Sequence, residues 1–212
     1  MEQYSKGVGT GPWFERMRAG LAEPATSLVT SPPNPVAAVL LPVVAADTPR
    51  LLFVRRAERL GKHGGQVAFP GGMWESADDS LIQTALREAE EEIGLSPQAV
   101  DLLGSLEPET SIYGVSVFPF VGAVSPPIVL RPEPSEIAAI FEVPLEALLD
   151  EARHRLVRIA SEGRAYRAPA FCWENELVWG LTYRILLRFL EKVCGFTPPV
   201  GRAPVEEVLR SD

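Results

Sequence analysis

Residues 64–72 read Gly64-Gly65-Gln66-Val67-Ala68-Phe69-Pro70-Gly71-Gly72, and after a short linker residues 87–94 read Arg87-Glu88-Ala89-Glu90-Glu91-Glu92-Ile93-Gly94. At about 100° per residue, the segment 80–95 collects its apolar residues in one arc. Glu88, Glu91 and Glu92 fill the adjacent arc, and Glu90 projects to the other side. The segment therefore predicts a helix that buries one stripe and gathers three carboxylates along its edge.

The glutamates alone are also compatible with a solvated helix face. Like charges at helical spacing cost only roughly 0.2–0.5 kcal/mol per pair on an exposed helix. The upstream residues favour a site instead, because Phe69-Pro70-Gly71-Gly72 is typical of a turn that ends a strand. Such a turn delivers the chain to a carboxylate-rich helix, where hard oxygen ligands suit Mg²⁺ or Mn²⁺.

This pattern resembles the Nudix hydrolase family, whose box reads Gly, five residues, Glu, seven residues, then Arg-Glu-apolar-x-Glu-Glu-x-Gly-apolar. The second half matches from Arg87 to Leu95. In the first half Asp79 stands where Glu is usual and Met73 where Gly is usual. We therefore expect one extra residue in the loop, with Asp78 or Asp79 in place of the Glu.

The same loop spacing occurs in the coenzyme A pyrophosphatase branch of that family. The stretch 51–72 is similar to a second signature of this branch, and Trp179-Gly180-Leu181-Thr182 also resembles it. The resemblance implies an α/β fold, the Nudix-type α/β/α sandwich with a mixed β-sheet. We expect an N-terminal extension with a short helix (1–33), a Nudix hydrolase domain (34–196) and a C-terminal tail (197–212).

Apolar runs and turn residues place the elements. Strands are expected at 36–46, 51–55, 67–69, 100–106, 113–124, 137–143, 156–159 and 166–171. Helices are expected at 13–21, 80–95, 144–149 and 178–193, and the tail has little to pack. Pro119 implies a bulge or an edge in its strand, because proline lacks the N–H that a sheet ladder uses.

Composition narrows the class of protein. The net charge of −8 gives no support to a general basic surface for nucleic acid. No apolar run reaches the roughly 18 residues of a membrane helix. The two cysteines, Cys172 and Cys194, read as reduced buried thiols. We expect a cytoplasmic enzyme that acts on a small nucleotide substrate and has no nucleic-acid or membrane partner. A homodimer is possible, because the short N-terminal helix could form a dimer contact.

Glu88 and Glu92 are the first predicted metal ligands, because positions i and i+4 of a helix lie one above the other. Glu91 either binds a second ion or is held by Arg87, for which the family implies a role in orienting the glutamates. The resemblance also places a base in the box or on a distant loop. Glu136 is that loop candidate, with Glu133 as a substitute, and a turn-capping role is the alternative for Glu136. The predicted catalytic residues are thus Glu91, Glu136 and Arg87.

The branch-like segment supplies the predicted substrate site. Coenzyme A carries a 3′-phosphate beyond its diphosphate, so additional arginine contacts would distinguish it from simpler nucleotides. Trp74 and Tyr113 are candidates for stacking on adenine, although packing is favoured for both, and His154 reads as a surface residue. The predicted substrate-binding residues are Arg55, Arg56, Arg59, His63, Gln66, Gly71 and Gly72.

The sequence predicts a Mg²⁺- or Mn²⁺-dependent diphosphatase that cleaves coenzyme A or acyl-coenzyme A to 3′,5′-ADP and 4′-phosphopantetheine. Two alternatives stay open. One is a broad nucleoside-diphosphate-X hydrolase of the ADP-ribose or NADH type. The other is a non-catalytic nucleotide-binding module, which the departures at Met73 and Asp79 keep in view and the intact glutamates argue against.

Overall fold

The structure is a computed structural model that describes residues 9–23, 35–61, 63–161, 164–200 and 206–208. Its main sheet has the strand order β3 (Val67–Ala68), β2 (Arg50–Arg56), β1 (Val36–Val44), β7 (Ser116–Val124) and β5 (Val100–Ser105). Three further strands join it: β4 (Gly71–Met73) on β1, β6 (Glu109–Thr110) on β7, and β8 (Ile137–Pro144) on β2. β1 and β7 run parallel and the other pairs antiparallel, so the sheet is mixed as expected.

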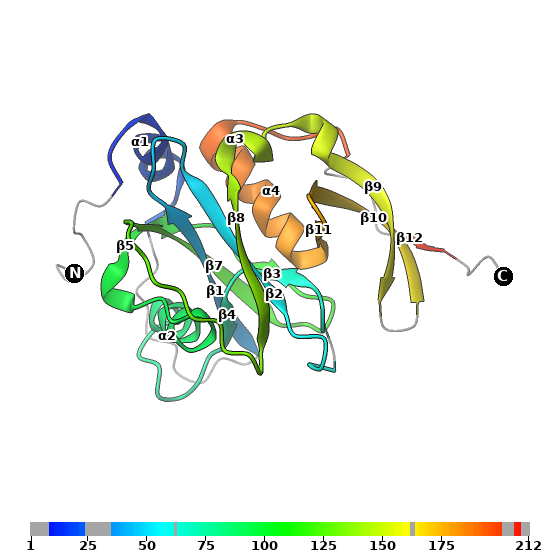
Figure 1. Cartoon of the computed structure of the whole chain (residues 1–212), viewed down its shortest axis with the longest axis horizontal. Helices are drawn as coiled ribbons and strands as arrows, with labels where there is room; N and C mark the ends of the chain where they lie inside the picture. Colours follow the sequence, from blue (N-terminus) through cyan, green and yellow to red (C-terminus); the bar gives the residue numbers. More distant parts are fainter. Residues whose placement is uncertain (1–8, 24–34, 62, 162–163, 201–205, 209–212) are drawn as a thin grey trace.

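Helices cover both faces of the main sheet (Figure 1). Helix α2 (Leu81–Ile93) packs on one face, whereas α1 (Pro12–Gly20) and α4 (Gly180–Cys194) pack on the other. Strand β2 shows why: Leu51 and Phe53 enter the core beneath α4, and Leu52 and Val54 enter the core beneath α2. Successive strand residues face opposite sides, so this continuous apolar run feeds two cores. The α/β/α architecture is confirmed.

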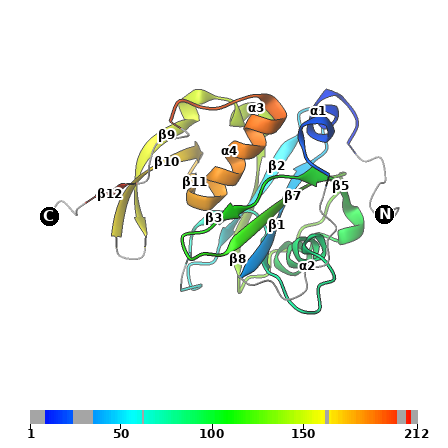
Figure 2. The same ribbon diagram turned by 180° about the vertical axis from the view of Figure 1, so that it is seen from behind.

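A second, smaller sheet stands beside α4 (Figure 2). The strand β10 (Arg164–Trp173) pairs with β9 (His154–Ser161), β11 (Glu176–Trp179) and β12 (Glu206–Val208). Before it come α3 (Leu145–Leu148) and a 3₁₀ turn, Glu151–Arg153, and another 3₁₀ turn, Pro97–Ala99, precedes β5. The expected helix at 178–193 thus begins only at Gly180, after β11. The tail that was expected to pack little contributes β12, although residues 201–205 and 209–212 lie outside the described part.

Helix α2 has the ends that its sequence predicts. The Ser80 hydroxyl accepts the Gln83 N–H at 3.2 Å, and Gly94 ends the helix in the left-handed region with φ 68°. The apolar arc is buried throughout, at Leu81, Ile82, Ala85, Leu86, Ala89 and Ile93. The helix is therefore fixed in rotation, and its glutamate edge is directed along the rim of the sheet.

The glycine pair 71–72 differs from the expected turn. It begins strand β4, which pairs antiparallel with β1 so that Gly72 lies opposite Ala38. Gly71 has φ 153°, and a Cβ there would meet the Ala38 carbonyl and the Val39 backbone. Glycine is needed for this close approach between two strands, and the strand carries the chain directly to the glutamates of α2.

Pro119 also differs from expectation, since β7 is an internal strand between β1 and β5. The Pro119 carbonyl accepts the Leu106 N–H at 3.0 Å, just beyond the end of β5 and before β6. In a strand the N–H and C=O of one residue point to the same side. The missing N–H therefore faces the junction between two short strands, where the opposite residue, Leu106, lies outside both of them.

No helix in the described ranges has both the length and the apolar content to cross a membrane. Cys172 and Cys194 are unpaired and half-buried.

Candidate active site

Arg87 holds the acidic edge of α2 together. Its guanidinium forms a two-pronged ion pair with Asp78, with Nε to Oδ1 at 2.9 Å and Nη2 to Oδ2 at 3.0 Å. Its Nη1 donates to Glu88 Oε1 and Glu91 Oε2, both at 3.0 Å, and Nη2 also reaches the Met73 carbonyl. Arg87 thus contacts two of the three predicted ligand glutamates.

Asp78, and not the exposed Asp79, is the aspartate that Arg87 contacts. Asp78 is buried and also accepts hydrogen bonds from Thr84 Oγ1 at 2.9 Å and from the Glu75 N–H at 3.1 Å. Burial alone would raise the pKa of this carboxyl, but the hydrogen bonds from Arg87, Glu75 and Thr84 lower it below its ordinary value. Asp78 is therefore a fixed anion that anchors Arg87.

Glu92 is the most buried of the glutamates, with 3% of its surface exposed. Its Oε2 accepts the Gly71 N–H at 3.0 Å, and its Oε1 lies 3.4 Å from Arg56 Nη1. Burial raises the pKa of Glu92 to about 7, against the Gly71 hydrogen bond and the charge of Arg56, and the neighbouring charges of Glu88 and Glu136 add to the rise. The Gly71 hydrogen bond and the charge of Arg56 therefore do not offset the cost of burying this charged carboxylate.

Glu88 lies directly over Gly72, where a Cβ would meet its carboxylate. Burial raises the pKa of Glu88 above its ordinary value, and the charges of Glu91 and Glu136 act in the same direction against Arg87. Glu88, Glu92 and Glu136 therefore form a cluster of like charges that repel one another. Such a cluster at a sheet edge is suited to a bound cation.

The donors fit Mg²⁺ or Mn²⁺ in chemistry, because carboxylate oxygens are hard ligands. They do not form a ready-made cage: within the described ranges, no three His, Cys, Asp or Glu residues gather closely enough to hold a metal ion. Arg87 occupies oxygens of Glu88 and Glu91, and Gly71 occupies one of Glu92. Metal binding would therefore require these side chains to move closer together.

Glu136 belongs to the turn 131–136, which docks on the end of α2. The Arg131 N–H donates to the Ile93 carbonyl and the Glu133 N–H to the Glu92 carbonyl, both at 2.8 Å. The Glu133 carboxylate caps the turn itself by accepting from Ser135 Oγ at 2.6 Å and from the Ser135 N–H. Glu136 keeps an exposed side chain on the side of Glu88 and Glu92.

The other side of this turn is held by the branch-like segment. The Ala57 N–H donates to the Glu136 carbonyl at 2.7 Å. Arg59 donates to the carbonyls of Pro134 and Ser135. The segment therefore fixes the backbone that carries Glu136, which sequence spacing alone did not indicate.

The predicted substrate arginines are not brought together at one point. Arg56 pairs with Glu92, and Arg59 holds the turn 131–136. Arg55 instead pairs with Glu176 of β11 at 2.8 Å. His63 Nδ1 lies 3.2 Å from Gln66 Oε1, and the His63 ring meets Tyr113 edge-on.

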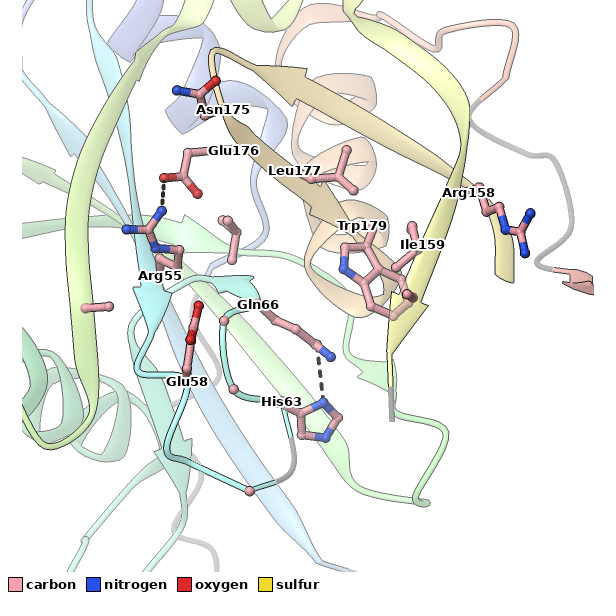
Figure 3. A pocket seen from close by; sticks show the side chains of 16 residues that line it. Arg55, Glu58, His63, Gln66, Arg158, Ile159, Asn175, Glu176, Leu177 and Trp179 are labelled. Carbon is pink, nitrogen blue, oxygen red and sulfur yellow. Dashed lines mark hydrogen bonds and ion pairs between the residues drawn. The ribbon is translucent and has the colours of Figure 1, made fainter. Parts of the chain in front are cut away.

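A pocket of about 730 Å³ opens between this segment and the second sheet (Figure 3). One wall comes from the loop that contains His63, Gly64, Gly65 and Gln66, and the other includes Arg158, Glu176 and Trp179. The second wall was not predicted, because its residues lie 90 or more positions further along the chain in no recognisable spacing. Only the similarity of 179–182 to the coenzyme A pyrophosphatase branch pointed toward it.

Two expectations about single side chains are decided by their contacts. Trp74 packs against the α2 core, and its Nε1 donates to the Asp78 carbonyl at 3.1 Å, in line with a packing role. The surface reading of His154 is wrong, because His154 is 4% exposed. Its Nδ1 lies 2.9 Å from the Tyr183 hydroxyl and its Nε2 lies 2.9 Å from the Leu148 carbonyl, so burial leaves both ring nitrogens satisfied.

A mixed sheet between helices, with an arginine-held glutamate helix on one face, defines the class of protein. Residues 33–161 match the model of the NUDIX domain, so the chain belongs to the Nudix hydrolase family. It is 42% identical over 160 residues to the "Uncharacterized Nudix hydrolase NudL" of Photorhabdus laumondii, covering 76% of this chain and 86% of the relative. The protein of the same name from Salmonella paratyphi B is 45% identical over 150 residues, 71% of this chain and 78% of that one.

Among solved structures, a MutT/nudix family protein from Enterococcus faecalis has the same fold. Its TM-score is 0.50 at 16% sequence identity, and the match covers 76% of this chain and 62% of that one.

Proposed function

We propose that this Nudix hydrolase is a Mg²⁺- or Mn²⁺-dependent diphosphatase acting on coenzyme A or acyl-coenzyme A, with 3′,5′-ADP and 4′-phosphopantetheine species as products. One observation carries the proposal. The segment that resembles the coenzyme A pyrophosphatase branch contacts Glu92 through Arg56, contacts the Glu136 turn through Ala57 and Arg59, and forms a wall of the pocket.

Each side chain of the site has a separate role in the proposed hydrolysis. Divalent ions, when bound, would neutralise diphosphate oxygens and acidify a water molecule. Glu88 and Glu92 would hold them, with Glu91 as a further ligand, and Arg87 would orient these glutamates. Glu136 would accept the proton of the attacking water as its oxygen bonds to one phosphorus and the bridging P–O bond breaks. Gly71 and Gly72 keep the strand beside the glutamates free of side chains.

Product analysis tests the substrate. Purified protein is incubated under Mn²⁺ with coenzyme A, ADP-ribose, NADH, diadenosine polyphosphates and nucleoside triphosphates, and the products are separated. We expect 3′,5′-ADP from coenzyme A as the fastest reaction. Turnover of ADP-ribose without any of coenzyme A would reject the substrate and favour the broad nucleoside-diphosphate-X hydrolase.

A matched pair of variants separates an enzyme from a binding module. Glu92→Gln removes a buried ligand but keeps an acceptor for the Gly71 N–H, whereas Glu90→Gln makes the same change on the exposed opposite side of α2. We expect a rate loss of about 100-fold or more for Glu92→Gln, an unchanged rate for Glu90→Gln, and similar thermal unfolding of both. Equal residual activity in the two variants would favour the binding module.

A further inference from the structure

Strand β11 contributes to the pocket from outside the part of the chain that matches the family domain. That match ends at residue 161, whereas Glu176, Leu177 and Trp179 of the pocket wall lie beyond it. The pocket of about 730 Å³ has the size of sites that hold small molecules, roughly 300–1,000 Å³. A cavity that combines residues of the matched domain with residues beyond it is a candidate for substrate selection.

The pocket adjoins the glutamate cluster. Arg55 lines the pocket, and the next residue of β2, Arg56, pairs with Glu92. On the neighbouring strand, Ala138 lines the pocket two residues after Glu136. Arg55 and Arg56 leave β2 on opposite faces of the main sheet, so a molecule whose reacting group sits at the glutamates would reach the pocket around the end of that strand.

Two long-range contacts fix the walls relative to each other. The Arg55–Glu176 ion pair, at 2.8 Å, joins β2 to β11. The Thr182 hydroxyl donates to the Val67 carbonyl at 3.0 Å and joins α4 to β3. The space between the walls is consequently set by the fold and does not depend on a bound partner.

The lining favours a planar aromatic ligand. The half-buried Trp179 ring stacks on Tyr166, with centroids 6.4 Å apart and an interplanar angle of 28°. Figure 3 shows this ring between Gln66 and Ile159, with the Gln66 amide beside it. A flat ring next to an amide can stack on a heteroaromatic base and hydrogen-bond to its edge.

The charged side chains of the lining lie apart from the Trp179 ring. Arg55 and Glu176 neutralise each other, and Glu58 lies on the Arg55 side of the pocket (Figure 3). Arg158 also belongs to the lining, but it lies opposite Arg167, whereas its neighbour Ile159 lies opposite Tyr166, the residue that stacks on Trp179. Arg158 therefore projects from the other face of the second sheet, and Figure 3 shows its guanidinium directed away from the ring. The aromatic ring is thus the part of the lining that recognises a ligand.

We propose that this pocket binds the nucleoside end of the substrate, with the base stacked on Trp179. The other half of a coenzyme A-type substrate is an extended amide chain without an aromatic ring, and it would leave Trp179 unused. The inference rests on the proposed function for the identity of the nucleotide, but the base pocket is tested without hydrolysis.

Calorimetric titration of the full chain with 3′,5′-ADP, 5′-AMP and 4′-phosphopantetheine tests the site. Stacking of a base on an aromatic ring contributes about 1–3 kcal/mol, so Trp179→Ala is expected to weaken both nucleotides about tenfold or more and leave 4′-phosphopantetheine unchanged. Trp179→Phe should retain most of the affinity.

Trp173→Ala is the matched control, since Trp173 is a half-buried tryptophan of the same sheet that does not line the pocket. It should bind nucleotides like the wild type, and circular dichroism should show folded protein for every variant. Unchanged nucleotide affinity in folded Trp179→Ala, or a loss confined to 4′-phosphopantetheine, would overturn the proposal. If wild type binds nucleotide through Trp179 but does not cleave coenzyme A, the pocket stands and the substrate assignment alone fails.

Discussion

Single side chains of this site connect several segments at once. Arg87 joins the loop before α2, through Asp78 and Met73, to the acidic edge of the helix, through Glu88 and Glu91. A planar guanidinium with five donors can do this in one geometry, whereas a lysine ammonium cannot pair with Asp78 through two parallel bonds. The placement of the glutamates therefore depends on one residue outside the metal-binding set.

The two adjacent glycines predict opposite defects. A Cβ on Gly72 would meet the flexible carboxylate of Glu88, whereas a Cβ on Gly71 would meet the Ala38 carbonyl and the Val39 backbone at φ 153°. We expect Gly72→Ala to lower kcat with little loss of stability. Gly71→Ala should instead destabilise the fold, because backbone cannot move aside.

Urea unfolding and steady-state kinetics on both glycine variants check this pair. Equal loss of stability in the two would show that Gly72 serves the sheet and not the placement of Glu88.

His154 predicts a pH dependence of stability. Burial lowers the pKa of His154 below its ordinary value of about 6.5, so the unfolded chain takes up a proton more readily than the folded one. The contribution of His154 is therefore complete above about pH 6.5 and declines as the pH falls, by at most about 1.4 kcal/mol per pH unit. Glu92 acts in the opposite sense, because its folded pKa of about 7 lies above its ordinary value.

Comparing wild type with His154→Gln isolates the histidine, since Glu92 is common to both. The free energy of unfolding in urea is measured from pH 8 to pH 5. The difference between the two proteins should shrink toward acid pH. A constant difference would show that His154 does not titrate with folding.

At the scale of elements, the end of α2, the turn 131–136 and the segment after β2 form one unit. The turn donates to the Glu92 and Ile93 carbonyls on one side and is held by Ala57 and Arg59 on the other. Glu136 is thus positioned by backbone contacts from two directions. Movement of either support would displace a proposed base relative to the glutamates.

Arg59 is consequently predicted to act by positioning and not by touching substrate. Arg59→Met removes both donors to the turn while keeping the length of the side chain, and it should lower kcat about tenfold or more with little change in KM. Arg59→Lys should recover part of the loss. When combined with Glu136→Gln, Arg59→Met should add little, because both changes disable the same carboxylate.

Arg155→Met is the control. Arg155 lies on β9 of the second sheet, and its side chain donates to the nearby Ala152 carbonyl. Steady-state kinetics with coenzyme A decides the outcome. A raised KM for Arg59→Met at unchanged kcat would assign Arg59 to substrate binding, as the sequence predicted.

The features that sequence predicts well are local ones. Helix α2, its Ser80 start and its Gly94 end follow from residues within one segment. Strand β4 was missed because glycines at a strand start and in a turn look alike until the partner β1 is known. His154 was misread because Tyr183, which lies 29 positions away, determines its burial. The pairing of Arg55 with Glu176 joins residues 121 positions apart, and no pattern along the chain encodes it.

At the scale of the whole molecule, two sheets meet along the pocket, and Arg55 and Glu176 bridge them. Arg55 is 40% exposed at its side chain, so the free-energy contribution of this ion pair to folding is small, at most about 1 kcal/mol. We expect Glu176→Gln to alter nucleotide affinity more than stability. Titration calorimetry and urea unfolding on the same preparation check this, and a large loss of stability with unchanged affinity would contradict it.

The position of this pocket along the chain has an evolutionary consequence. The carboxylates proposed for catalysis lie before residue 161, and strand β11 with Trp179 lies after it. In evolution, the carboxy-terminal portion can therefore change and admit a different substrate, while the carboxylates proposed for hydrolysis are retained.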